Sequence, residues 1–183
     1  PEDLKGLKMR FFGLGGQVMQ KLGVSTTLLP GGEIFPALEK KAIDASEFSM
    51  PAIDKRLGFH KLVKYNYFPG WHQQATLFEL LINKDVWNSM DEQQQAVTNM
   101  TCMAATTNSL AEGEAIQFSV MKENVEKNGV KIMYWSDDML NTFRSAWDEV
   151  VKENLPDPMF KKVWDDLSTF RAGYDLWEKN AFL

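Results

Sequence analysis

The stretch that decides the fold is KMRFFGLGGQVMQKLGVSTTLLPGGEIFPALEKKAIDASEF, residues 8–48. Segments 7–12, 24–29 and 43–48 are short and rich in apolar or β-branched residues, which is typical of strands. Segments 17–23 and 33–42 have the helical spacing and the flanking glycines of helices. Strands that alternate with helices over short connections form a parallel sheet covered by helices. The sequence therefore predicts an α/β fold.

The middle of the chain predicts a strand and a long helix. An aromatic run at 65–74 leads into ATLFELLIN, residues 75–83, which we expect to be a buried strand. Residues 91–129 form one long helical pattern whose apolar positions fall in steps of three, four and seven. Such a helix is longer than a compact domain needs, so we expect it to connect two parts of a larger body. Its predicted apolar face consists of Val97, Met100, Ala104, Ala111, Ala115, Phe118, Met121 and Val125.

The last part of the chain predicts one more strand, at 130–135, and two helices. Ser136 has the place of a helix cap before acidic residues, and Pro156 and Pro158 end that helix. The final segment carries an aromatic and aliphatic stripe that is heavy for a terminal helix. Its members are Phe160, Val163, Trp164, Leu167, Phe170, Tyr174 and Trp177.

Composition excludes several classes of protein. The chain has 183 residues and a formal net charge of −5, and no Lys/Arg cluster supplies the basic field that a nucleic-acid partner requires. Its one cysteine, Cys102, excludes an internal disulfide and a thiol-rich metal site, and we expect it to pack as a small apolar residue. No apolar run reaches the ~18 residues of a membrane span. Because the sequence starts at Pro1 with no leader, we expect a fragment of a longer protein.

The glycine cluster raises the alternative of a nucleotide site. Gly13 and Gly15 fit the start of the dinucleotide pattern G-x-G-x-x-G, but Val18 stands where the third glycine belongs. Glu33 is near the expected acidic position, yet it follows a turn and precedes a helix. A Walker lysine is also missing. The alternative function is thus a nucleotide-dependent α/β enzyme that uses the Gly13–Gly16 loop, and a further one is a lobe without any ligand.

Arg10 is the other candidate in this stretch. Placed at the carboxyl end of a parallel strand, it lies where open α/β sheets bind ligands. Its planar guanidinium can grip a carboxylate through two parallel hydrogen bonds. The competing interpretation is an ordinary strand-edge arginine with its head in water. Spacing alone leaves both open.

A second group of candidates follows two later strands. Glu47 ends a predicted strand on the same sheet edge as Arg10, or else it is a surface carboxylate paired with Arg56. Trp71, His72, Gln73 and Gln74 follow a Pro-Gly turn, and such polar and aromatic mixtures are common in small-molecule pockets. His60 and His72 lack the spacing of zinc ligands, and no nucleophile and base are assembled.

These motifs resemble a known family. DLKGLKMRFFGLGGQVMQKLG, GGEIFPALEKKAIDASEF and YNYFPGWHQQ together resemble the substrate-binding (DctP-type) subunits of tripartite ATP-independent periplasmic (TRAP) transporters. More narrowly, the sequence resembles the branch for keto and hydroxy acids, which includes members labelled mannitol/chloroaromatic. It covers essentially the whole chain. It implies a periplasmic-binding-protein fold with a parallel or mixed sheet, a long connecting helix and C-terminal helices, and a non-enzymatic function.

The resemblance also implies roles for single residues. Arg10 matches the arginine that binds the substrate carboxylate, while Trp71 and Gln73 fall in a region of further substrate contacts. Glu47 matches a ligand of a bound sodium or calcium ion, Phe48 would add its backbone carbonyl, and Gln73 is a further ligand candidate, with Gln74 as the neighbouring choice. Relatives carry tryptophan at the position of Phe48. Carboxylate and carbonyl oxygens are ligands that hard cations prefer, and a ligand oxygen beside the substrate carboxylate would favour 2-oxo or 2-hydroxy acids.

Family members are about twice as long as this chain, which predicts that the first lobe and the signal peptide are absent here. Residues 1–90 would be the second α/β lobe, 91–129 the connecting helix, and 130–183 a hinge strand with C-terminal helices. The implied function is capture of a small organic acid in the periplasm for a membrane permease, without an organic cofactor. The C-terminal stripe either packs on its own lobe or forms a homodimer through the terminal helix.

Overall fold

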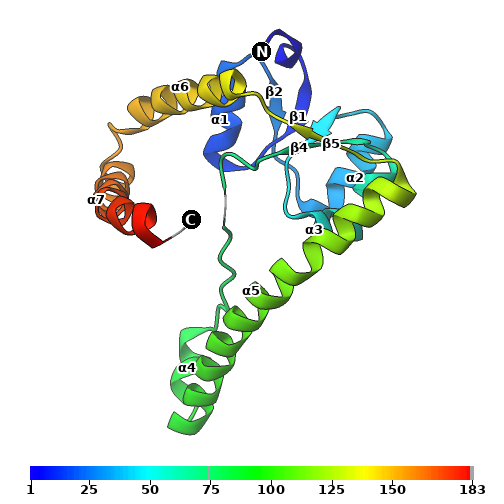
Figure 1. The fold of residues 1–183 in the computed structure, drawn as a ribbon. Coiled ribbons are helices and arrows are strands. Elements are labelled where there is room, and N and C mark those ends of the chain that lie inside the picture. The colour runs from blue at the N-terminus through cyan, green and yellow to red at the C-terminus, as the bar shows by residue number, and fades with distance from the viewer. Residues whose placement is uncertain (74, 182–183) are drawn as a thin grey trace. The chain divides into compact units, whose positions relative to one another are not determined.

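The computed structural model describes residues 1–73 and 75–181, and these fall into two compact units (Figure 1). The first unit combines Pro1–Leu28 with Ser136–Leu183, and the second is Leu29–Trp135.

In the first unit a helix connects two parallel strands, as the sequence predicts. Strand β1 (Lys8–Arg10) pairs with β2 (Ser25–Thr27), and helix α1 (Gly13–Lys21) connects them. A short 3-10 helix, η1 (Glu2–Leu4), precedes β1. The core of this β-α-β element consists of apolar side chains that are almost completely buried, namely Phe11, Val18, Met19 and Val24.

Helix α6 (Asp137–Asn154) covers α1 in the same unit and begins where Ser136 predicts a cap. The Ser136 hydroxyl accepts the Met139 N–H at 3.2 Å. The helix buries Phe143, Ala146, Val150 and Val151 on one side, so apolar burial holds it in place.

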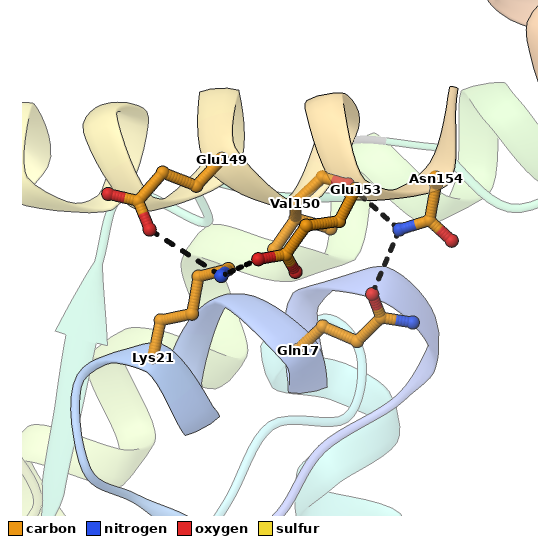
Figure 2. Close-up of polar contacts among 6 residues, drawn as sticks. All are labelled: Gln17, Lys21, Glu149, Val150, Glu153 and Asn154. Carbon is orange, nitrogen blue, oxygen red and sulfur yellow. Dashed lines mark hydrogen bonds and ion pairs between the residues drawn. The ribbon is translucent and has the colours of Figure 1, made fainter. Parts of the chain in front are cut away.

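Polar bonds fix how α6 lies on α1 (Figure 2). Lys21 Nζ lies 2.6 Å from Glu153 Oε1 and 3.5 Å from Glu149 Oε2. Asn154 Nδ2 donates to Gln17 Oε1 in α1 at 3.1 Å, and within α6 it also donates to the Val150 carbonyl at 2.8 Å. Because the two carboxylates are largely exposed, these bonds set register more than stability.

Helix α7 (Pro158–Ala181) follows and buries none of its described residues. Near its start the Trp164 ring lies 6.0 Å from that of Trp147 in α6. Further along, the stripe is solvent-exposed, with Phe170 at 63% and Trp177 at 60%. Most of the stripe therefore finds no cover within its own unit.

The second unit begins with a small helical core. Helix α2 (Gly31–Glu39) leads to the short strand β3 (Ala45–Ser46), helix α3 (Pro51–Arg56) and the 3-10 helix η2 (Phe59–Lys61). Pro36 lies in the second turn of α2. The core of this part is Ile34, Leu38, Ile43 and Phe59.

The predicted late strand and long helix are both present. Strand β4 (Tyr65–Phe68) pairs in parallel with β5 (Lys131–Tyr134). Between them run α4 (Lys84–Ser89) and the 37-residue helix α5 (Glu92–Asn128). Figure 1 shows α4 beside the start of α5, where the Gln95 side chain donates to the Trp87 carbonyl at 2.8 Å.

The ends of α5 have well-formed caps. The Asp91 side chain accepts the Gln94 N–H at 2.7 Å, and the Gln94 side chain accepts the Asp91 N–H at 3.0 Å. This reciprocal pair is a capping box. At the other end Gly129 has a φ of 66°, the left-handed conformation that glycine adopts without strain.

Three sequence expectations in this unit are wrong. Residues 75–83 are not a strand, and Leu77 and Phe78 are 87% and 95% exposed, because no described strand pairs with this segment. The predicted face of α5 is largely exposed, since the helix packs through the side that carries Ile116, Val120 and Asn124. Cys102 is exposed rather than packed.

In the described residues no helix is both long and apolar enough to span a membrane.

Candidate functional site

Arg10 is the last residue of β1 and is buried, with 5% of its surface exposed. The interpretation of a strand-edge arginine with its head in water is therefore wrong. A charge that is withdrawn from water is costly unless partners compensate for it. A buried arginine at the carboxyl end of a parallel strand has the position and the chemistry of a residue that binds an anionic ligand.

The glycine cluster beside Arg10 forms the first turn of α1 rather than a loop. Gly13 has a φ of 60° and lets the chain leave β1 sharply, while Gly15 and Gly16 are buried. A Cβ added at Gly16 would lie 3.7 Å from the Phe11 carbonyl oxygen, so this turn is in van der Waals contact with the residue that follows β1. The glycines thus serve the strand-to-helix connection.

Glu47 and Phe48 follow β3 in the second unit. The Glu47 side chain is 15% exposed, and its Oε1 lies 3.7 Å from His72 Nε2, a distance that makes an ion pair when the histidine is protonated. The Ser46 hydroxyl donates to the Glu47 carbonyl at 2.8 Å. The expectation of a surface carboxylate is therefore wrong, because Glu47 is mostly enclosed.

The Phe48 ring is part of the wall of the second unit's core. It meets Phe59 edge to face at 5.9 Å and packs against the core cluster that Phe59 forms with Ile34, Leu38 and Ile43. A Cβ added at Gly31 would lie 2.7 Å from this ring, so the start of α2 approaches it closely. The ring therefore fixes the chain at the residue whose carbonyl is the predicted ligand.

The residues after the Pro-Gly turn separate into two groups. Trp71 and His72 lie together, with ring centroids 5.1 Å apart, and His72 reaches Glu47. Gln73 donates from Nε2 to the Thr76 hydroxyl at 2.9 Å. Its neighbour Gln74 lies outside the described residues. The structure thus brings Glu47, Trp71 and His72 together, and gives Gln73 a different contact.

Sequence reasoning missed Asp54, in α3. Its Oδ1 accepts the Ser49 N–H at 3.2 Å. Burial raises the pKa of Asp54 to about 7, the nearby Glu47 charge adds to this, and the Ser49 bond opposes it. The signal that could have found it is an acid in the first turn of a helix that starts directly after the predicted ligands.

The residue types near Glu47 fit a hard cation. A carboxylate with a backbone carbonyl is the oxygen set that sodium or calcium accepts. Among residues 1–73 and 75–181, no three or more His, Cys, Asp or Glu side chains gather as a metal cluster. A cation here would therefore depend on backbone and amide oxygens as well as on Glu47.

Similarity to known proteins shows the family of this chain. The model of the bacterial extracellular solute-binding protein family 7 (DctP) matches residues 1–156. The chain belongs to this family. Its members bind solutes for transport and are not enzymes, so the alternative of a nucleotide-dependent enzyme on Gly13–Gly16 is not supported.

Among curated relatives, the chain is 34% identical over 178 residues to a monocarboxylate 2-oxoacid-binding periplasmic protein of Nostoc sp.. The match covers 97% of this chain and 49% of that protein, so the chain spans about half the length of this relative.

Two solved TRAP solute-binding proteins share the fold. One from Pseudoalteromonas atlantica, with bound sodium and pyruvate, is 32% identical with a TM-score of 0.87, over 97% of this chain and 54% of that one. One from Bordetella bronchiseptica, a mixed-occupancy dimer with calcium and picolinate, is 31% identical with a TM-score of 0.82, over 98% and 55%. Related proteins thus bind a small carboxylate together with a cation.

Proposed function

We propose that the protein containing this chain is a periplasmic TRAP solute-binding component that captures a 2-oxo or 2-hydroxy carboxylate and delivers it to a membrane permease. The observation that carries the proposal is the buried Arg10 at the carboxyl end of β1. The family match and the pyruvate bound to a relative support the substrate class.

In this proposal Arg10 binds the substrate carboxylate. A guanidinium offers two parallel N–H donors that match the two oxygens of a carboxylate. Burial strengthens the attraction because little water screens it. A lysine at the same position would keep the charge but lose the planar fork.

Glu47 and the Phe48 carbonyl hold a sodium or calcium ion, with Gln73 as a further ligand. The ion supplies positive charge that offsets Glu47 beside an anionic substrate. The keto or hydroxyl oxygen of the substrate would be a natural additional ligand, which favours such acids over simple monocarboxylates. Trp71, packed on His72, provides apolar surface for the substrate.

The chain contributes part of the cleft, and the remaining length of the relatives contributes the rest. In this proposal residues 1–90 form a lobe, residues 91–129 a connecting helix and residues 130–183 a C-terminal part. It expects weak ligand binding by this chain alone. Tight calorimetric binding of pyruvate with calcium to residues 1–183 would contradict that expectation.

We also propose that α7 forms a homodimer. Phe170, Leu176 and Trp177 expose apolar surface that a second copy can cover, and the Bordetella bronchiseptica relative is a dimer. Light scattering of the full-length protein should show a dimer. A monomer at high concentration would remove this part of the proposal.

The test of the proposed site is calcium-dependent pyruvate binding by the full-length protein. Glu47→Gln should weaken calcium binding by at least about tenfold and weaken pyruvate binding with it, because an amide carries no charge. A matched control is Glu126→Gln, which neutralises an exposed carboxylate on α5. Equal calcium affinity in the Glu47 variant and the control would contradict the assignment.

A further inference from the structure

We propose that Asp54 is the positioning residue of the cation site, because its carboxylate holds the Phe48–Ser49 peptide and so directs the Phe48 carbonyl. This inference rests on the proposed function, in which that carbonyl is a cation ligand. In this inference Asp54, which is partly buried, orients a cation ligand without binding the cation itself.

The geometry follows from one hydrogen bond and from peptide planarity. The Ser49 N–H donates to Asp54 Oδ1 at 3.2 Å. The Phe48–Ser49 peptide is trans, so its N–H and its C=O point in opposite directions in one plane. A carboxylate that fixes the N–H therefore also fixes the carbonyl, which faces away from Asp54.

Asp54 can act as a fixed point because α3 is tied to the long helix α5 on both sides of it. The Ala52 N–H donates to Gln117 Oε1 at 3.0 Å, and Lys55 Nζ lies 2.5 Å from Glu123 Oε2. Gln117 is itself held, since its Nε2 donates to the Gly113 carbonyl at 2.7 Å. The direction of the Phe48 carbonyl is thus set from a helix rather than from a loop.

The charge of Asp54 adds to this geometric effect. A negative acceptor at the N–H end of a peptide polarises the whole unit, so the carbonyl oxygen at the other end becomes more negative. A more negative carbonyl is a better ligand for a hard cation. Asp54 therefore improves the ligand that it orients.

The test uses the full-length protein and calcium alone as the probe, in calorimetric titrations. Asp54→Ala removes the acceptor and should weaken calcium binding by about tenfold or more, the usual effect of removing a group that orients a metal ligand. Asp54→Asn keeps an acceptor oxygen and should recover most of this loss. Val150→Ala, which opens the core of the other unit, lowers stability by a different route and should leave the calcium affinity unchanged.

A second readout observes the peptide directly. Labelling phenylalanine with ¹³C at the carbonyl and serine with ¹⁵N selects Phe-Ser peptides, which this chain has at 48–49 and at 118–119. Asp54→Ala should shift the Ser49 amide signal and leave Ser119, in the middle of α5, as an internal reference. A Ser49 signal that does not respond to Asp54→Ala would overturn the inference.

The two proposals fail in different ways. Calcium binding that depends on Glu47 but stays within about threefold in Asp54→Ala would overturn the positioning role alone. Binding of neither calcium nor sodium by the wild-type protein would overturn the cation site and this inference with it. A weak Asp54→Ala variant that Asp54→Asn restores would support both.

Discussion

Asp54→Asn should stabilise this chain at pH 8 more than at pH 5 when no cation is present. The folded protein holds the pKa of Asp54 at about 7, against 3.8 for an unperturbed aspartate. Below the lower value both states are protonated and folding carries no penalty. Between the two values the folded state keeps a proton that the unfolded state has lost, so wild-type stability falls as the pH rises through this window.

The magnitude follows from the width of the window. A shift of about 3 pH units corresponds to ~4 kcal/mol at most, reached when the pH exceeds both values. Part of that window lies below pH 5, and the side chain is partly exposed, so we expect a difference on the order of 2 kcal/mol between pH 5 and pH 8. Asparagine does not titrate, and it keeps an acceptor for the Ser49 N–H.

The assay is urea denaturation of the wild type and Asp54→Asn at both pH values. The quantity that matters is the change with pH in the difference between the two unfolding free energies, because other titrating groups cancel in it. A carbon-detected titration of the Asp54 carboxyl gives its pKa independently. A difference that does not vary with pH, together with a titration near 4, would refute the reasoning.

Three further outcomes are expected. Phe143→Ala in the core of α6, where the ring is 1% exposed, should cost about 3–5 kcal/mol of unfolding free energy in urea denaturation, and a cost below about 1 would contradict this packing. Gly31→Ala should push the Phe48 ring away and destabilise the second unit by about 1–3 kcal/mol, while Gly32→Ala, with open space at its Cβ, should not. Lys21→Met should cause a small loss of thermal stability at low salt that disappears at high salt, because the charges that Lys21 contacts are exposed; a loss that salt does not change would argue against the ion pairs with Glu149 and Glu153.

The first fifty residues could be predicted well because their signals are local. Glycines at 13, 23 and 31 and short apolar segments indicate the order of strands and helices. In the same way, Ser136 predicts the start of α6. The position of Arg10 at a strand end also followed from this order. Its burial did not, since exposure depends on neighbours that are distant in sequence.

The wrong predictions have a common physical cause, because the burial of a residue depends on the segments that pack against it. Residues 75–83 have the composition of a buried strand, but a strand also needs a neighbouring strand to complete its hydrogen bonds. The same holds for α5, where periodicity showed an apolar face but could not show which side would meet α3. Asp54 could not be predicted from the sequence because its role depends on a hydrogen bond from the Ser49 N–H, five residues before it in the chain.

The measurement that tests the central claim most directly is pyruvate affinity, in the presence of calcium, for the full-length protein and its Arg10→Lys and Arg10→Ala variants. We predict that Arg10→Ala weakens binding by at least about thirtyfold and that Arg10→Lys recovers only part of it, because the bidentate geometry is lost while the charge remains. Melting curves show which variants stay folded. Folded Arg10 variants that bind pyruvate within about threefold of the wild type would contradict the account.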